Sequence, residues 1–448
     1  MTEPQLESKS PHLRQNIGLF QAIMYGTGLI LGAGIYVLIG DVANIAGNAM
    51  WISFLLAALI ATFTGLSYAE LTSMLPKSAA EYVFVKNAFG SNLFAFVTGW
   101  LIIFVAVVSA AAVAIGFSGY LAGFIQGVPP IISAVMLVAA LSAINFIGIR
   151  QSAWMNTIFT LVELVGLAII IGAGLVIASP AAENYYEMPP TITSGPLAVG
   201  AILGAAGLVF FAYFGFENLA NLAEETRNAR KAIPVALVAS IVITTVIYVL
   251  VAVSAIALVG WDELSSTEAP LALAAERAFG RTGTVLMSSI ALFATTNTVL
   301  ALLVAGSRIV FGMASDHALP ASLSKVHPKT QTPSMAILAV MAGTIGIVAV
   351  SSGRIDAVAS VAVFGIFIVY AFVNLSLIRL RYRKPEMERP FLSPLRVRRF
   401  PILAGLGVVT SVAMLFQLDW TTAVAGIAAI GSGTGAYLIL GSKGRRGK

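Results

Sequence analysis

Two carboxylates stand inside apolar segments that are long enough to cross a lipid bilayer. Glu163 lies in FTLVELVGLAII, and Glu217 ends the segment GLVFFAYFGFE. A charged group at such depth is costly and is usually retained for transport or for pairing. Glu163 could therefore carry a proton, or attract a cation together with the hydroxyl groups of Thr295 or Thr296 and the amide of Asn297. Glu217 has two interpretations, a gating or proton-carrying acid and a charge that stabilises the start of a helix.

Glycines interrupt two of the apolar segments. The first cluster, GTGLILGAGIY, covers residues 26–36, and the second, GLVFFAYFGFE, covers residues 207–217. A broken helix leaves free N–H and C=O groups that can bind the carboxylate and the ammonium group of a zwitterion. Close packing, for example of Gly28 with Gly32, would explain a single cluster. Two clusters that each open one half of the chain favour a pair of broken helices instead.

The composition excludes several classes of function. Of the 448 residues, 58% are hydrophobic and 10% are charged, whereas soluble chains carry about 25% charged residues. The chain has no cysteine, and its three histidines have no metal-ligand spacing, which argues against disulfides, thiol catalysis and a metal site. No Walker motif is visible, so we expect no nucleotide or other cofactor and an ion gradient as the energy source.

We predict an all-α membrane protein with twelve transmembrane helices, because apolar runs that can cross about 30 Å of hydrocarbon alternate with polar breaks. The predicted spans are residues 17–46, 50–74, 93–125, 129–148, 152–178, 198–224, 234–260, 284–313, 332–350, 355–379, 400–418 and 421–440. We expect two inverted repeats of five helices, followed by two further helices. The corresponding divisions are 1–16 (tail), 17–178 (first repeat), 198–381 (second repeat), 400–440 (last two helices) and 441–448 (tail).

Basic residues gather on one side when alternate loops are assigned to alternate sides of the membrane. This side receives both tails and the loop RLRYRKPEMERPFLSPLRVRRF, while the other receives Arg277, Arg281 and Arg354. The positive-inside rule then predicts a multi-pass protein of the cell membrane with both termini cytoplasmic, in contact with lipid and not with nucleic acid. Glu70 is interpreted as an interfacial charge, and Glu224–Glu225 as a solvated or ion-paired face.

Four motifs together resemble those of the amino acid–polyamine–organocation (APC) transporters, which have the LeuT-type fold. They are GLILGAGIY, PKSAAEYVFVKNAFG, FFAYFGFENLANLAEETRNARKAIP and RIVFGMASDHALPASLSKVHPKTQTP. The resemblance covers roughly the first 350 residues. The sequence departs from the family pattern at Ala79 and Ala80, where glycines are usual, and at Asn228-Ala229, where the family has Asn-Pro.

The resemblance implies a substrate site at the two breaks. Its expected members are Gly32, Ala33 and Gly34, whose backbone would meet the carboxylate, and Ile30, Phe211 and Phe214, whose carbonyls would meet the ammonium group. Phe210, the first residue of an aromatic run, is also expected to line the site, and Phe211 would close it as a gate. A single phenylalanine of this run is more simply explained by packing, but not beside a helix break.

Two positions bear on the substrate and the coupled ion. Relatives that carry cationic amino acids place an acid where Val105 stands, so a small neutral or apolar amino acid is expected. Some proton-coupled relatives carry a lysine at the position of Glu163, in place of a sodium ion. We predict a secondary carrier that works by alternating access and is coupled to protons, with sodium symport or amino acid and amine exchange as alternatives. A membrane-embedded enzyme and a channel fit less well.

Overall fold

The apolar segments fold into helices, as their composition predicts. The computed structural model describes residues 13–32, 34–125, 127–177, 184–190, 195–267, 269–351, 355–418 and 420–445. In this part of the chain, the regular elements are helices apart from one short β-hairpin. The prediction of an all-helical membrane protein is confirmed at this level.

Each predicted apolar segment contains helix. The first half comprises α1 (Leu19–Leu31), α2 (Gly34–Ala46), η1 (Gly47–Ala49), α3 (Met50–Met74), α4 (Ala80–Phe89), α5 (Asn92–Ala122), α6 (Pro130–Ile147) and α7 (Ile149–Val176). The second half comprises α8 (Pro196–Phe210), η3 (Phe211–Tyr213), η4 (Phe216–Glu225), α9 (Ala229–Val259), α10 (Trp261–Ser265), α11 (Pro270–Phe279), α12 (Arg281–Ser315), η5 (Ala321–Ser324), α13 (Ser334–Val350) and α14 (Ile355–Arg383). The hairpin β1 (Arg396–Val397) and β2 (Phe400–Pro401) then leads to α15 (Ile402–Leu415) and α16 (Trp420–Arg445).

Nine helical segments of the described residues are long and apolar enough to cross a membrane. Three further apolar helices, α8, α13 and α15, have 15, 17 and 14 residues. The short helices α4, α10 and α11 are absent from the prediction, because each is amphipathic or too short to register as an apolar run.

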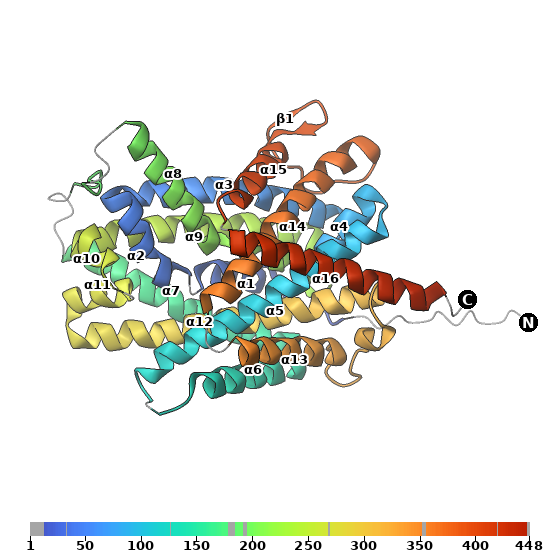
Figure 1. Ribbon diagram of the computed structural model, residues 1–448, viewed down its shortest axis with the longest axis horizontal. Helices are drawn as coiled ribbons and strands as arrows, with labels where there is room; N and C mark the ends of the chain where they lie inside the picture. Colours follow the sequence, from blue (N-terminus) through green and yellow to red (C-terminus); the bar gives the residue numbers. More distant parts are fainter. Residues whose placement is uncertain are drawn as a thin grey trace, which may run out of the picture.

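Of the two helices around the first glycine cluster, α1 lies in the middle of the bundle and α2 toward the end opposite the marked termini (Figure 1). α1 packs against α7, α9 and α12, while α3 packs along α9, and α5 packs along α12 and α14. In Figure 1, α4 and the last turns of α16 lie toward the same end of the bundle. We call this end, with residues 13–17 beside η4, the terminal end.

An ion pair without solvent contact holds the terminal end. The side chains of Arg308 in α12 and Glu225 in η4 are fully buried, and Nε and Nη2 of the arginine donate to the two carboxylate oxygens at 2.8 and 3.1 Å. Arg308 Nη1 also donates to Oδ1 of Asn145 in α6, at 2.5 Å. The backbone carbonyl of Glu225 accepts the N–H groups of Asn16 and Ile17, both at 3.0 Å. The Arg308–Glu225 pair therefore connects α6, α12, η4 and the segment before α1.

Two acids are more deeply buried than their sequence context predicts. Of the two interpretations of Glu225, the ion-paired one is correct and the solvated one is wrong. The interpretation of Glu70 as an interfacial charge did not include its burial in an ion pair with Arg381. Glu70 is fully buried, and its oxygens accept from Arg381 at 3.0 and 2.5 Å and from the N–H of Ser393 at 2.9 Å. The partners of both acids are distant in the sequence, so the local pattern does not contain them.

Replacing Arg308 by Ala should destabilise the protein by about 3–5 kcal/mol, because Glu225 would stay buried without its cation. Thermal unfolding of the purified protein in detergent would measure the loss. Arg281, which is exposed at the start of α12, offers the matched control, and Arg281→Ala should change stability by about 0.5 kcal/mol or less. Removing both charges with Arg308→Met and Glu225→Leu should restore much of the stability. Equal midpoints of thermal unfolding for Arg308→Ala and Arg281→Ala would contradict the stabilising role of Arg308.

Candidate functional site

Both glycine clusters interrupt their helices. α1 ends at Leu31 and α2 begins at Gly34, and Gly32 between them has a φ of 23°. In the second cluster α8 ends at Phe210, η3 follows, and Gly215 adopts a φ of 118° before η4 begins. Ala33 lies outside the described residues. Positive φ is readily adopted only by glycine, so the two breaks depend on the residue type found there.

The two breaks contact each other. A Cβ on Gly215 would lie 3.0 Å from Cβ and 3.1 Å from the carbonyl oxygen of Leu29, and one on Gly34 would lie 3.1 Å from Cα of Ala212. Gly28 has a different role, because a Cβ there would lie 2.0 Å from a side-chain oxygen of α7. Close packing is thus the correct explanation for Gly28, whereas Gly32 and Gly215 form the breaks.

Tyr248 of α9 forms hydrogen bonds with carbonyl groups at both breaks. Its hydroxyl is fully buried and lies 2.5 Å from the carbonyl oxygen of Ile30 and 3.1 Å from that of Ala212. These are carbonyls that the helix interruptions leave without intrahelical partners. Ile30, which the sequence suggested as an acceptor for an ammonium group, therefore already has one donor. Tyr248 was not predicted, since a tyrosine in an apolar helix carries no further signal.

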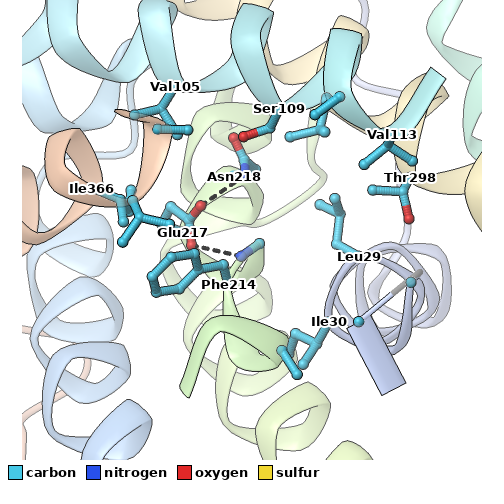
Figure 2. Close-up of a pocket in the computed structure, with 18 of the residues that line it drawn as sticks. Leu29, Ile30, Val105, Ser109, Val113, Phe214, Glu217, Asn218, Thr298 and Ile366 are labelled. Carbon is cyan, nitrogen blue, oxygen red and sulfur yellow. Dashed lines mark hydrogen bonds between the residues drawn. The ribbon is translucent and has the colours of Figure 1, made fainter. Parts of the chain in front are cut away.

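A cavity of about 680 Å³ opens beside the breaks. Figure 2 shows part of its walls, and the lining residues come from α1, α2, α5, α8, η3, η4, α12, α14 and α16 and from the segments that connect them. The labelled apolar lining residues are Leu29, Ile30, Val105, Val113, Phe214 and Ile366. Gly32 and Gly34 also line it, and the cavity extends to Gln417 and Thr422 at the α15–α16 connection. The cavity therefore combines exposed backbone at the breaks with an apolar wall.

Glu217 is the acid that lines the cavity among the described residues (Figure 2). Its Oε2 accepts from the N–H of Gly215 at 2.9 Å and from the hydroxyl of Tyr370 at 2.7 Å, and its Oε1 accepts from Nδ2 of Asn218 at 3.0 Å. The bond to Gly215 ties the carboxylate directly to the break. This geometry supports the helix-start interpretation of Glu217 and also leaves the acid beside the cavity.

The polar end of the cavity contains two residues that the sequence did not reveal. Asn218 and Ser109 both line it, and Figure 2 shows their side chains directed toward each other. The buried Oδ1 of Asn218 has no hydrogen-bond partner among the described residues. A bound molecule could supply the missing donor, since buried polar groups are rarely left unsatisfied.

Glu163 belongs to a separate buried cluster on the other side of α1. Its Oε1 accepts from Nδ2 of Asn297 at 3.0 Å, while Oε2 has no partner among the described residues. The same amide nitrogen donates to Oγ1 of Thr160 at 3.0 Å, and that hydroxyl donates to the carbonyl of Met24 in α1 at 3.2 Å. Asn156 donates to Oδ1 of Asn297 at 2.6 Å. The cluster thus contacts α1 shortly before its break.

The remaining predicted residues lie in several environments. The structure brings Asn297 to Glu163, but the hydroxyls of Thr295 and Thr296 bond to carbonyls of their own helix. Phe210 is buried and stacks on Phe367 with ring centroids 5.6 Å apart, away from the cavity lining. The side chain of Phe211 lies outside the described part of the structure, so its role as a gate stays a prediction.

Comparison with known proteins identifies the family. A family model described as amino acid permease matches residues 17–437. The chain belongs to the amino acid permease family. This permease is therefore a multi-pass membrane transporter and not an enzyme, and the resemblance to APC transporters is confirmed.

Individual relatives match nearly the whole permease. The branched-chain amino acid permease BcaP of Bacillus subtilis is 29% identical over 432 residues, which are 92% of this chain and 90% of the relative. An uncharacterized transporter of Mycobacterium tuberculosis is 32% identical over 427 residues, or 95% and 91% of the two chains. The methylthioribose transporter of Bacillus subtilis is 27% identical over 459 residues, or 98% and 95%.

A third acid of the permease connects α4 to the helix after the second break. Glu81 is fully buried in α4, which lies outside the membrane-length segments. Its carboxylate accepts from Nδ2 of Asn221 in η4, at 3.1 and 3.3 Å, and from the hydroxyl of Tyr68 at 3.1 Å. Oδ1 of Asn221 in turn accepts the N–H of Ala80 at 2.8 Å. Burial raises the pKa of Glu81 to about 7, although the bond from Asn221 opposes this rise.

The stability of the permease should decrease as the pH rises through about 7. A raised pKa means that the folded state favours protonated Glu81, so the stabilisation is complete below the ordinary carboxyl range and is lost as the buried group ionises. Thermal unfolding in detergent between about pH 5 and pH 9 tests this. Glu81→Gln should flatten the profile, while Glu276→Gln, at an exposed acid of α11, should leave it unchanged. If the unfolding temperature varies with pH in the same way in the wild type, Glu81→Gln and Glu276→Gln, Glu81 is excluded as the responsible group.

Proposed function

We propose that this permease is a secondary carrier for a neutral amino acid with an apolar side chain, bound in the cavity beside the two breaks. The observation that carries the proposal is that backbone from both interrupted helices lines one cavity, at Ile30, Gly34 and Gly215. Free peptide N–H groups at a helix start attract a carboxylate, and free carbonyls attract an ammonium group. A zwitterion therefore finds both partners within one site.

The wall opposite the breaks supports an apolar side chain for the substrate. Val105, Leu302 and Ile366 line it from three different helices. No cationic side chain and no acid other than Glu217 line the cavity among the described residues. Glu217 already accepts three hydrogen bonds, so it is poorly placed to neutralise a cationic substrate side chain. The branched-chain amino acids for which BcaP is named have apolar side chains of this kind.

The proposed architecture is two inverted five-helix repeats, residues 17–178 and 198–381, followed by two helices, with twelve membrane crossings in all. The support is that each repeat begins with an interrupted helix, α1–α2 and α8–η4. The basic loops and tails favour a cytoplasmic position for both termini. The cavity, which extends toward the α15–α16 connection, would then face the outside while the Arg308–Glu225 pair closes the cytoplasmic side.

Uptake of labelled solutes into proteoliposomes tests the substrate proposal. Leucine, isoleucine and valine should accumulate saturably, and lysine and methylthioribose should not. Val105→Asp should weaken leucine uptake and permit lysine binding, because the new carboxylate pairs with the cationic side chain. Val105→Asn has nearly the same shape without the charge and is the matched control.

Other outcomes would contradict the proposal in distinguishable ways. Accumulation of methylthioribose in preference to leucine would replace the substrate class but retain the carrier. Flux that does not saturate would indicate a channel.

We further propose that Glu163 carries the coupled proton. Its unpartnered Oε2 can take a proton, while the amide N–H of Asn297 directs positive partial charge toward the carboxylate and disfavours a sodium ion there. Through Thr160 and Met24 the cluster contacts α1 close to the break. Protonation could thereby change the packing of α1 and couple the proton to the substrate site.

Replacing Glu163 by Gln should abolish proton-driven accumulation and leave solute binding within about a factor of three. Thr295→Val separates this mechanism from sodium coupling, because the Thr295 hydroxyl would be a ligand only in a sodium site. With proton coupling, Thr295→Val retains uptake under an imposed pH gradient. If sodium alone drives uptake and Thr295→Val abolishes it, the proton proposal fails. Undiminished accumulation by Glu163→Gln would exclude Glu163 in either case.

A further inference from the structure

The connection between α14 and α15 ends in a small hairpin. Arg396 pairs with Pro401 and Val397 with Phe400, so Arg398 and Arg399 form a two-residue turn. Arg398 adopts a φ of 55° at this turn, and the hairpin is closed by the bond from the N–H of Ile402 to the carbonyl of Leu395, at 3.0 Å. We call residues 395–400 the arginine hairpin.

Buried contacts of Glu70 fix the segment that precedes the arginine hairpin. Its carboxylate binds Arg381, the N–H of Ser393 and, at 3.3 Å, Nε of Arg389. The N–H of Phe391 also donates to Oγ of Ser73 at 3.2 Å. Because residues of α3 bind both α14 and the segment before the hairpin, these contacts fix the position of the arginine hairpin relative to α3.

Two groups of arginines near this connection differ in their surroundings. Arg381 and Arg389 are buried or partly buried and share the carboxylate of Glu70. Arg396, Arg398 and Arg399 are exposed, and no acid of the described residues forms an ion pair with them. Three positive charges on a six-residue segment thus lack a partner within the described chain.

The same hairpin exposes apolar side chains. Leu395, just before β1, is 64% exposed, and Val397 in β1 is 61% exposed. Phe400, the cross-strand partner of Val397, lies against α15, where a Cβ on Gly405 would meet its ring at 2.8 Å. The exposed leucine and valine would be unfavourable in water but are suited to the boundary between lipid headgroups and acyl chains.

The position of the hairpin in the chain explains this combination. It follows α14, a membrane-length helix, and leads directly into the apolar helix α15. In the proposed architecture both helices lie in the membrane, so the connection between them lies at its surface, and the inference rests on that proposal. We propose that the arginine hairpin is a binding site for anionic phospholipid headgroups, with the arginines on the phosphates and Leu395 and Val397 in the interfacial region. Free phosphate would use the charges but not the apolar face.

Quenching of a fluorophore on the hairpin tests the proposal in the full-length protein. The chain contains no cysteine, so Val397→Cys offers a unique attachment site. The labelled protein is reconstituted in vesicles of phosphatidylcholine and phosphatidylglycerol, with one or the other lipid brominated on its acyl chains. Brominated phosphatidylglycerol should be preferred at the probe by about fivefold or more, and Arg398→Gln with Arg399→Gln should remove most of this preference. Added salt should also weaken it.

Three controls make the result decisive. Arg281→Gln changes an exposed arginine of α12 and should retain the full preference. Thermal unfolding of the hairpin variant in detergent should be unchanged, which excludes misfolding. Inorganic phosphate at constant ionic strength should not displace phosphatidylglycerol. Equal quenching by both lipids, no quenching by either, displacement by phosphate, or an undiminished preference in the hairpin variant would each overturn the proposal.

Discussion

The requirement that peptide groups find partners inside a membrane governs this structure. Lipid supplies no hydrogen bonds, so an interrupted helix is stable only where protein, water or a ligand meets its free N–H and C=O groups. The chain contains two such interruptions in contact with each other. Tyr248 meets carbonyls of both, and Glu217 meets the N–H of Gly215. Other backbone groups at the breaks line the cavity, and a bound zwitterion could form hydrogen bonds with them.

Buried charge is the second constraint, and buried acids occur in two kinds of environment. Arg308–Glu225 and Arg381–Glu70 are complete ion pairs with several additional hydrogen bonds, and they connect elements at the terminal end. Breaking such a pair is expensive, so it favours one arrangement of the helices. Glu163 differs, because it lies among amides and hydroxyls without a cation among the described residues. A change in its charge state therefore alters the energy of its surroundings, as a coupling site requires.

The position of α1 relates these features to one another. This helix contacts the Glu163 cluster at Met24 and Gly28, its break lines the cavity, and the segment before it is bonded to Glu225. A movement of α1 would affect all three places. The glycines at the break permit such a movement, and the packing of Gly28 against Thr160 would transmit it to the cluster. This arrangement gives the proposed coupling a physical path through directly contacting groups.

The sequence by itself determined the membrane class, the helical content, the two interruptions and the presence of two acids inside apolar segments. These properties follow from local composition, because an apolar run, a glycine cluster or a charge inside such a run has the same meaning in any fold. Only the tertiary structure decided the partners. Tyr248 and Ile30 are 218 residues apart, Asn297 and Glu163 are 134 apart, and Arg381 and Glu70 are 311 apart. Each of these residues alone is compatible with several roles, since a hydrogen bond depends on atoms that only the packing of the helices brings together. For this reason the sequence did not predict the buried ion pairs of Glu225 and Glu70, and the position of Asn218 beside a cavity followed only from the structure.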